Sequence, residues 1–185
     1  LHKTVVAYER TLINCIRRAE YLAKQGWDIF ASPALKYFLY NDINADWFTS
    51  HPEALDMYSQ LDDSDIWSAV KVWAQSDDKL LSMLADDVIN RHIFKVEVRE
   101  EPVSDEEQHE LRKSLAEKAG ISYDDAGYLM SVNTIQKDMY DINDDHISIL
   151  YKDGTIKDIT EASELLNVDL LSKKVRKYYL CYQRF

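Results

Sequence analysis

The chain contains little glycine, proline or cysteine and no long apolar run, and each of these shortages excludes a class of structure. Only four glycines and three prolines occur among the 185 residues, so no Gly- or Pro-rich low-complexity linker divides the chain. No apolar run approaches the roughly 20 residues that a membrane helix needs, and we expect no membrane partner. Cys15 and Cys181 lie in apolar patterns. We expect them to be buried, reduced thiols of a cytoplasmic protein rather than a disulfide.

Basic residues are also few, at 22 Lys and Arg against 33 Asp and Glu, which gives a net charge of −11. A surface with this charge cannot displace counterions from a phosphate backbone, so nucleic acid is an unlikely partner. Four of the basic residues nevertheless recur every seven residues near the start: Lys3, Arg10, Arg17 and Lys24. This stripe is either a solvated face that pairs with acidic residues elsewhere in the chain, or a face turned toward phosphate or another subunit.

A recognisable set of metal ligands is missing as well. None of the five histidines is followed by Asp, and no other spacing of His, Cys, Asp and Glu is typical of a metal site. We therefore expect no catalytic residue, metal or cofactor in this chain. The hydrophobic content of 46% and charged content of 30% are those of an ordinary globular protein with one domain or two small ones.

Residues 1–92 have the periodicity of helices. Asp62, Asp63 and Asp65 favour a helix start, because side-chain acceptors and negative charge stabilise that end. Apolar residues then recur at three- and four-residue spacing, which predicts one buried helix face. The same spacing predicts that the four tryptophans pack in the core rather than stack on bases. They are Trp27, Trp47, Trp67 and Trp73.

Beyond residue 92 the pattern changes to alternating strands and capped helices. Ser104 and Glu107 form a capping box, and Asp153-Gly154 favours a tight hairpin turn. We predict strands over 93–98, 128–135, 146–151, 155–159 and 175–185, with helices after Ser104 and after Thr160. Without the extra hairpin arm, the order is strand, helix, strand, strand, helix, strand. The expected fold class is therefore α+β, with an all-helical domain at 1–92 and a ferredoxin-like βαββαβ domain at 93–185.

Residues 61–95 resemble the helical region downstream of the catalytic core in HD-domain phosphohydrolases, the family that includes the deoxynucleoside triphosphate triphosphohydrolases. The resemblance implies a longer protein that hydrolyses nucleotide phosphates with a water activated by a divalent metal. The sequence opens at Leu1 inside an amphipathic pattern with no capping residue before it. We expect the chain to be the C-terminal part of that protein, inactive alone, which supports a missing N-terminal HD core and contributes to homo-oligomer contacts.

The resemblance also implies a regulatory nucleotide site. Nucleotide-regulated members use a His-Lys pair, matched here by His2 and Lys3, and an Arg-x-x-Phe-Lys pattern, matched by Arg91 and Lys95. Such cations suit a triphosphate. Alternatively, Arg91 and Lys95 only pair with the neighbouring Asp86 or Asp87. At the level of function, the alternative is a non-catalytic ferredoxin-like module that binds a regulatory ligand or partner.

Overall fold

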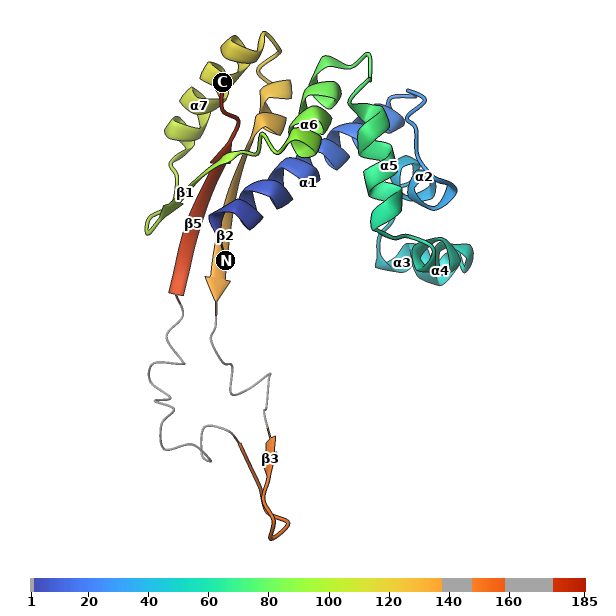
Figure 1. The fold of residues 1–185 in the computed structure, drawn as a ribbon, viewed down its shortest axis with the longest axis vertical. Helices are drawn as coiled ribbons and strands as arrows, with labels where there is room; N and C mark the ends of the chain where they lie inside the picture. The colour runs from blue at the N-terminus through green and yellow to red at the C-terminus, as the bar shows by residue number, and fades with distance from the viewer. Residues whose placement is uncertain (1, 138–147, 159–174) are drawn as a thin grey trace. The chain divides into compact units, whose positions relative to one another are not determined.

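The computed structural model describes residues 2–137, 148–158 and 175–185, and it combines helices with β-structure (Figure 1). This confirms the α+β class. The described helices are α1 (Lys3–Lys24), α2 (Pro33–Tyr40), α3 (Ala45–Ser50), α4 (Glu53–Ser59), α5 (Asp63–Trp73), α6 (Lys79–Asn90), α7 (Asp105–Ala119) and the 3₁₀ helix η1 (Asp125–Leu129). The described strands are β1 (Lys95–Arg99), β2 (Met130–Lys137), β3 (Ser148–Leu150), β4 (Ile156–Asp158) and β5 (Val175–Tyr182).

The chain divides into two compact units. The first comprises Leu1–Glu97, Val103–Val132 and Leu180–Phe185, and the second comprises Val98–Pro102 and Asn133–Tyr179. The predicted domains, 1–92 and 93–185, stay a prediction. All the cavities and polar networks considered below lie within the first unit.

Side-chain caps explain where several helices begin. Asp62 accepts hydrogen bonds from the backbone N–H groups of Ser64 and Asp65, and the Asp65 carboxylate accepts from the Asp62 N–H, so the predicted acidic helix start is a full capping box. The start of α1 corrects the prediction that no capping residue precedes it. His2 is the N-cap, and its Nδ1 accepts a hydrogen bond of 3.3 Å from the Thr4 N–H.

The core of the first unit forms around α1, which packs against α2, α6 and η1. Both cysteines are buried and unpaired, as predicted. Trp73 is buried as expected, and its Nε1 donates a hydrogen bond of 2.8 Å to the carbonyl of Phe30. The prediction that all four tryptophans pack in the core was wrong for Trp27 and Trp67, which are 43% and 44% exposed.

The β-structure forms two sheets. A three-stranded sheet has the order β1-β5-β2, and β3 and β4 form an antiparallel hairpin that pairs Ile149 with Lys157. Gly154 has a φ of +86°, the left-handed conformation that the Asp-Gly turn predicts. The order of the described strands does not confirm a ferredoxin-like arrangement, and the helix predicted after Thr160 lies outside the described residues. None of the described helices has both the length and the apolar character that crossing a membrane requires.

Candidate functional site: a basic cavity beside the start of α1

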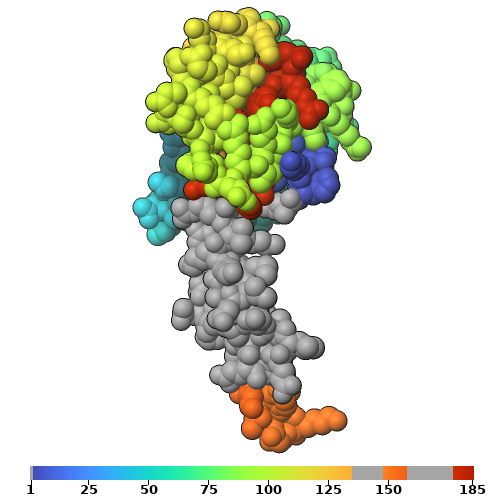
Figure 2. Space-filling model, turned by 90° about the vertical axis from the view of Figure 1, so that its left-hand side faces the viewer, coloured from blue at the N-terminus to red at the C-terminus, as the bar shows by residue number. Residues whose placement is uncertain are grey.

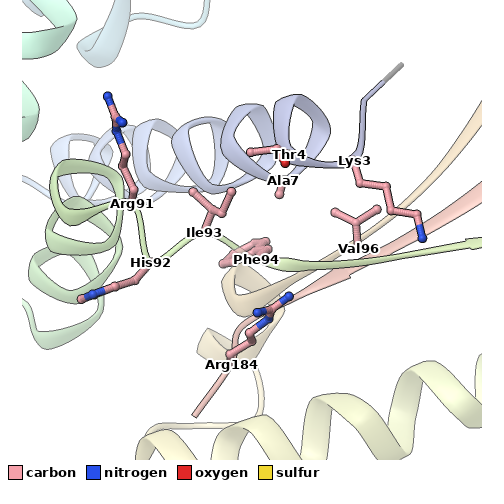
Figure 3. A pocket seen from close by; sticks show the side chains of 9 residues that line it. All are labelled: Lys3, Thr4, Ala7, Arg91, His92, Ile93, Phe94, Val96 and Arg184. Carbon is pink, nitrogen blue, oxygen red and sulfur yellow. The ribbon is translucent and has the colours of Figure 1, made fainter.

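A cavity of about 500 Å³ opens beside the start of α1, where three separate parts of the sequence meet (Figure 3). One wall comes from α1, one from the segment that joins α6 to β1, and one from the residues after β5. Figure 2 shows these segments close together on one face, in blue, green and red. The lining residues are Lys3, Thr4, Ala7, Arg91, His92, Ile93, Phe94, Val96 and Arg184.

The segment from α6 to β1 is placed by its backbone. Arg91 ends α6 in the left-handed conformation, with φ +60° and ψ +32°, and no other non-glycine residue in the described ranges has a positive φ. Glycine is the usual residue at such a helix end, because a Cβ is strained there. The Phe94 N–H then donates a hydrogen bond of 3.2 Å to the Thr11 hydroxyl, which fixes the segment against α1.

Three cationic side chains line this cavity. Lys3, Arg91 and Arg184 are all exposed, and none of them forms an ion pair within the part of the chain that the structure describes. Their charge is therefore available to a ligand rather than neutralised within the fold. Lys supplies a compact ammonium, whereas Arg supplies a planar fork of donors that matches phosphate or carboxylate oxygens. Chemically, the cavity is suited to a multiply charged anion.

The structure brings together two of the four residues predicted from sequence. Lys3 and Arg91 line the cavity, but His2 caps α1 and does not line it. Lys95 does not line it either. Its Nζ donates to the Tyr182 hydroxyl at 2.7 Å and to Glu97 Oε1 at 2.9 Å, and these bonds raise the pKa of Lys95.

The alternative, in which the basic residues pair with the end of α6, does not hold for Arg91. Asp86 accepts instead from Asn90 Nδ2 at 2.8 Å, and the nearest basic nitrogen to Asp87 is His92 Nδ1, 3.8 Å from Oδ1. Arg91 forms an ion pair with neither aspartate in the described structure.

Sequence reasoning missed Arg184. The residue belongs to a basic C-terminal run, in which five Lys and Arg occur between Leu170 and the end with no acid among them. That excess of charge was a signal, but it could not show which of the five cations lines the same cavity as Lys3. The pairing of β5 with β1 places Arg184 there.

A buried carboxylate, that of Asp87, lies on α6 one turn before the segment that lines the cavity. Asp87 is only 5% exposed, and its Oδ2 has no hydrogen-bond partner among the described residues. Burial raises the pKa of Asp87 to about 6, although a hydrogen bond from Gln183 and the charge of His92 act in the opposite direction. The Asp87 carbonyl also accepts the His92 N–H at 2.9 Å. This backbone hydrogen bond ties the end of α6 to His92, which lines the cavity.

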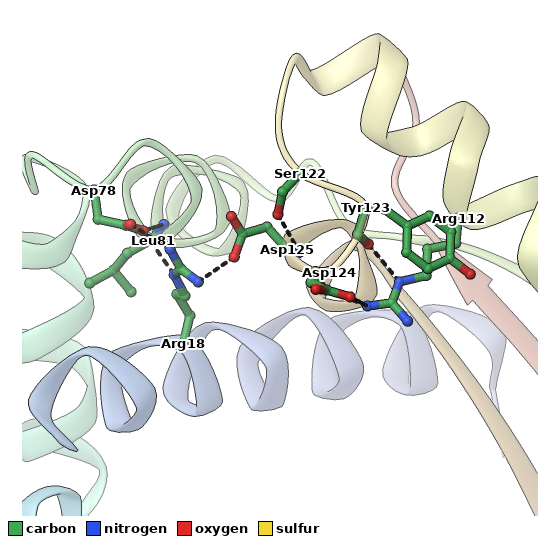
Figure 4. A network of polar contacts seen from close by, with 8 residues as sticks. All are labelled: Arg18, Asp78, Leu81, Arg112, Ser122, Tyr123, Asp124 and Asp125. Carbon is green, nitrogen blue, oxygen red and sulfur yellow. Dashed lines mark hydrogen bonds and ion pairs between the residues drawn. The ribbon is translucent and has the colours of Figure 1, made fainter. Parts of the chain in front are cut away.

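An ion-pair network links α1 to the start of α6 and to η1 (Figure 4). The buried Arg18 places Nη2 2.7 Å from Asp78 Oδ2 and Nη1 2.6 Å from Asp125 Oδ1. Burial alone raises the pKa of Asp78, but the hydrogen bonds from Arg18 and from the Leu81 N–H outweigh it and lower that pKa overall. All three charged side chains of this network are paired, which is the arrangement of a structural support.

The described residues offer no metal centre. No group of three or more His, Cys, Asp or Glu side chains that could hold a metal ion occurs among them. What the basic cavity can do is bind and orient an anion.

Comparison with solved structures finds proteins similar to this chain, and one of them matches it over its whole length. It is the crystal structure of a phosphohydrolase from Bacteroides thetaiotaomicron, which is 55% identical to this chain and superposes with a TM-score of 0.89. The similarity covers 100% of this chain and 46% of that one, so the chain spans about half the length of the protein it matches. Neither a protein-family model nor a curated protein sequence matches the chain.

Proposed function

We propose that this chain is the C-terminal part of a metal-dependent phosphohydrolase of the HD superfamily that acts on nucleotides. The observation that carries the proposal is the 55% identity, over the full length of this chain, to a bacterial phosphohydrolase. Over the length of this chain, the two proteins share their fold and just over half of their residues. The segment 61–95, which resembles HD phosphohydrolases, supports the narrower assignment to that superfamily. A ferredoxin-like fold for 93–185 belongs to the same proposal.

In this proposal the catalytic metal is held by the part of the protein outside this chain. The metal would activate a water molecule for attack on a phosphate. The chain itself supports the catalytic core, contributes to homo-oligomer contacts and binds a regulatory nucleotide through the basic cavity. Lys3 and Arg91 are the residues from the sequence hypothesis that support this role, and Arg184 joins them.

The test uses the longer protein, incubated with Mg²⁺ or Mn²⁺ and each of the four deoxynucleoside triphosphates. We expect triphosphate and a deoxynucleoside as products, separated by anion exchange. Hydrolysis of other phosphate esters, with every nucleotide left intact, would retain a phosphohydrolase but contradict the nucleotide substrate. No hydrolysis of any phosphate ester would contradict the whole assignment.

The regulatory role is tested in the same protein with Arg91→Ala and Lys3→Ala. Loss of one charge-assisted contact costs about 1.5–3 kcal/mol, so we expect about 10- to 150-fold weaker activation by nucleotide. Lys71→Ala, which removes an exposed cation of α5, is the matched control and should leave activation unchanged. If all three variants respond like the parent, the basic cavity is not the activator site.

The alternative is a non-catalytic module that binds a regulatory anion. The basic cavity supports it, because anion binding requires no metal centre. A His-Asp pair in the remainder of the longer protein favours the enzyme, and its absence there favours the module.

A further inference from the structure

A second, apolar cavity adjoins the basic one. It measures about 850 Å³ and shares three lining residues with the basic cavity: Thr4, Arg91 and Ile93. A third cavity of about 200 Å³ continues it, and the residues common to these two are Tyr8, Leu12, Trp67 and Val88. We call the two apolar cavities together the α1–α5–α6 groove, because their lining comes mainly from those three helices.

The groove follows α1 for about three turns. Its wall on this helix includes Val5, Tyr8, Leu12 and Ile16, which are three or four residues apart and therefore form one stripe. From the first to the last of them the helix rises about 16 Å. An apolar stripe of this length and spacing is the kind of surface against which the side chains of another helix pack.

Large apolar side chains of the groove remain exposed to solvent. Val5 is 56% exposed, Trp67 44% and Ile89 36%. These residues follow the helical periodicity that predicts core positions, yet no other part of the described chain covers them. Water contact with so much clustered apolar surface is unfavourable, so covering it with another apolar surface is favourable.

The charged residues of the groove are arranged by sign. Arg91 lines only the larger cavity, beside the start of α1, and Asp63 lines only the smaller one, beside Ile16. Glu9 lines the larger cavity part-way along α1. None of the three forms an ion pair within the described ranges. Because a helix is positive at its N-terminus and negative at its C-terminus, a helix in this groove is favoured with its N-terminus near Asp63 and its C-terminus near Arg91.

Relying on the proposed function only for the existence of a longer protein, we propose that the α1–α5–α6 groove holds an amphipathic helix from the part of that protein outside this chain. The helix lies antiparallel to α1, with its apolar face in the groove and Lys or Arg side chains toward Glu9 and Asp63. The matched phosphohydrolase has polypeptide to spare for this role, because this chain matches only 46% of it.

A second copy of this chain fits the groove less well. Among the described helices that do not line the groove, α4 is the one that exposes large apolar side chains, Leu55 and Tyr58. Its charged residues are all acidic, and it contains neither Lys nor Arg. Like charges would therefore face the carboxylates of the groove, which is unfavourable.

The first experiment measures whether the groove is covered. Ile89→Cys places a thiol in the groove, whereas Cys15 and Cys181 are buried. Its rate of reaction with a maleimide is quantified by mass spectrometry in the 185-residue chain and in the longer protein. We expect a rate at least about 10-fold lower in the longer protein, because a covered side chain reacts only after local opening. The two rates should be equal after unfolding in urea. Equal rates in the folded proteins would overturn the proposal.

The second experiment identifies what covers the groove. Photoreactive p-benzoylphenylalanine replaces Trp67 in the longer protein, and isotope-labelled and unlabelled protein are mixed before irradiation. We expect cross-links to a helix outside this chain that carries Lys or Arg, with both cross-linked peptides bearing the same label. Peptide pairs of mixed label mean that another copy fills the groove, and cross-links within this chain mean that it covers itself. Either result overturns the proposal, as does the absence of any cross-link to protein.

Charge reversal tests the basic character of the helix. Glu9→Lys, combined with Ile89→Cys in the longer protein, should raise the labelling rate about 2- to 5-fold, because the interaction lost is between partly exposed charges. Asp56→Lys is the matched control, because Asp56 is an exposed acid of α4 that does not line the groove. It should leave the labelling rate unchanged. If Glu9→Lys also leaves it unchanged, the groove does not hold a basic helix.

Hydrolysis of phosphate esters, assayed on the same preparations, separates the groove proposal from the proposed function. A longer protein that hydrolyses no phosphate ester but protects Ile89→Cys contradicts the proposed function and leaves the groove proposal standing. An active phosphohydrolase in which Ile89→Cys reacts as fast as in this chain overturns the groove proposal alone.

Discussion

At the residue scale, two arginines show how similar charges serve different purposes in this molecule. Arg18 is buried and paired with two aspartates, so it contributes to stability and has no charge to offer a ligand. Arg91 is exposed, unpaired within the described residues and held in a left-handed conformation. Local strain of this kind persists only where the surrounding structure enforces it, and it is concentrated at functional sites.

Replacing Arg18 with Leu should strongly destabilise the protein. The change leaves the Asp78 carboxylate, which is 11% exposed as a side chain, without its charged partner. Breaking a buried ion pair from one side costs about 3–5 kcal/mol. Urea unfolding should show this loss, while Arg17→Leu at the exposed neighbouring position should change the unfolding free energy by about 0.5 kcal/mol or less. Equal effects of the two variants would contradict a structural role for the network.

Asp87 should make stability depend on pH. Its pKa is raised from 3.8 to about 6 by burial, so the folded state binds this proton more tightly than the unfolded state. The stabilisation from protonated Asp87 is therefore complete below about pH 4 and is lost as the pH rises through 6. Asp87→Asn mimics the protonated form and should stabilise the protein at pH 8 by about 2–3 kcal/mol, with little effect at pH 4.

Asp86→Asn is the control for this prediction, because Asp86 is the exposed neighbour on the same helix. Unfolding free energies of both variants and the parent are compared at pH 4, 6 and 8. A constant difference between Asp87→Asn and the parent across this range would mean that Asp87 does not titrate as the structure implies.

At the element scale, the end of α6 combines an unfavourable backbone conformation with a position in the wall of the basic cavity. The helix stops at a residue that would be more stable as glycine, and that residue lines both cavities. The fold therefore keeps an arginine where backbone sterics favour glycine.

Substitutions of Arg91 should separate the effect of its backbone conformation on stability from the effect of its charge on anion binding. Arg91→Gly relieves the left-handed strain and should raise the free energy of unfolding by about 0.5–1 kcal/mol. Arg91→Ala keeps the strain and should give no such gain. Both variants should bind tripolyphosphate more weakly than the parent. If glycine destabilises the protein relative to alanine, the conformation at the end of α6 is not strained.

At the scale of the whole molecule, the chain presents a cavity lined by three cationic side chains, and no group of three or more potential metal ligands occurs among its described residues. It spans less than half of the phosphohydrolase that it matches. In the function proposed above, this chain supports and regulates an enzyme whose chemistry takes place elsewhere in the polypeptide.

The isolated chain should therefore be catalytically silent. With Mg²⁺ or Mn²⁺ it should release neither phosphate nor triphosphate from any deoxynucleoside triphosphate, as measured by chromatography of the products. The longer protein, assayed beside it, provides the positive control. Turnover by the chain that persists at constant specific activity through further purification would contradict the division of roles proposed here.

Much of the local structure was determined by the sequence alone, because it depends on contacts between residues close in the chain. The capping box at Asp62, the helix stop at Gly120 and the hairpin turn at Gly154 all follow from short-range hydrogen bonds and backbone sterics. The burial of both cysteines was likewise predictable from the apolar pattern around them. Lys3 and Arg91 were named as candidate binding residues through a family resemblance over short segments. That resemblance could not show where the two residues lie in the fold.

Only the tertiary structure decided which cations share a cavity and which aromatic residues remain exposed. Arg184 shares a cavity with Lys3 because β5 pairs with β1. The same pairing brings Tyr182 to Lys95, 87 residues away in sequence. Helical periodicity predicted that both Trp67 and Trp73 pack in the core. Trp73 is buried, whereas Trp67 lines an open groove. Periodicity identifies an apolar face, but whether that face is covered depends on which other elements pack against it.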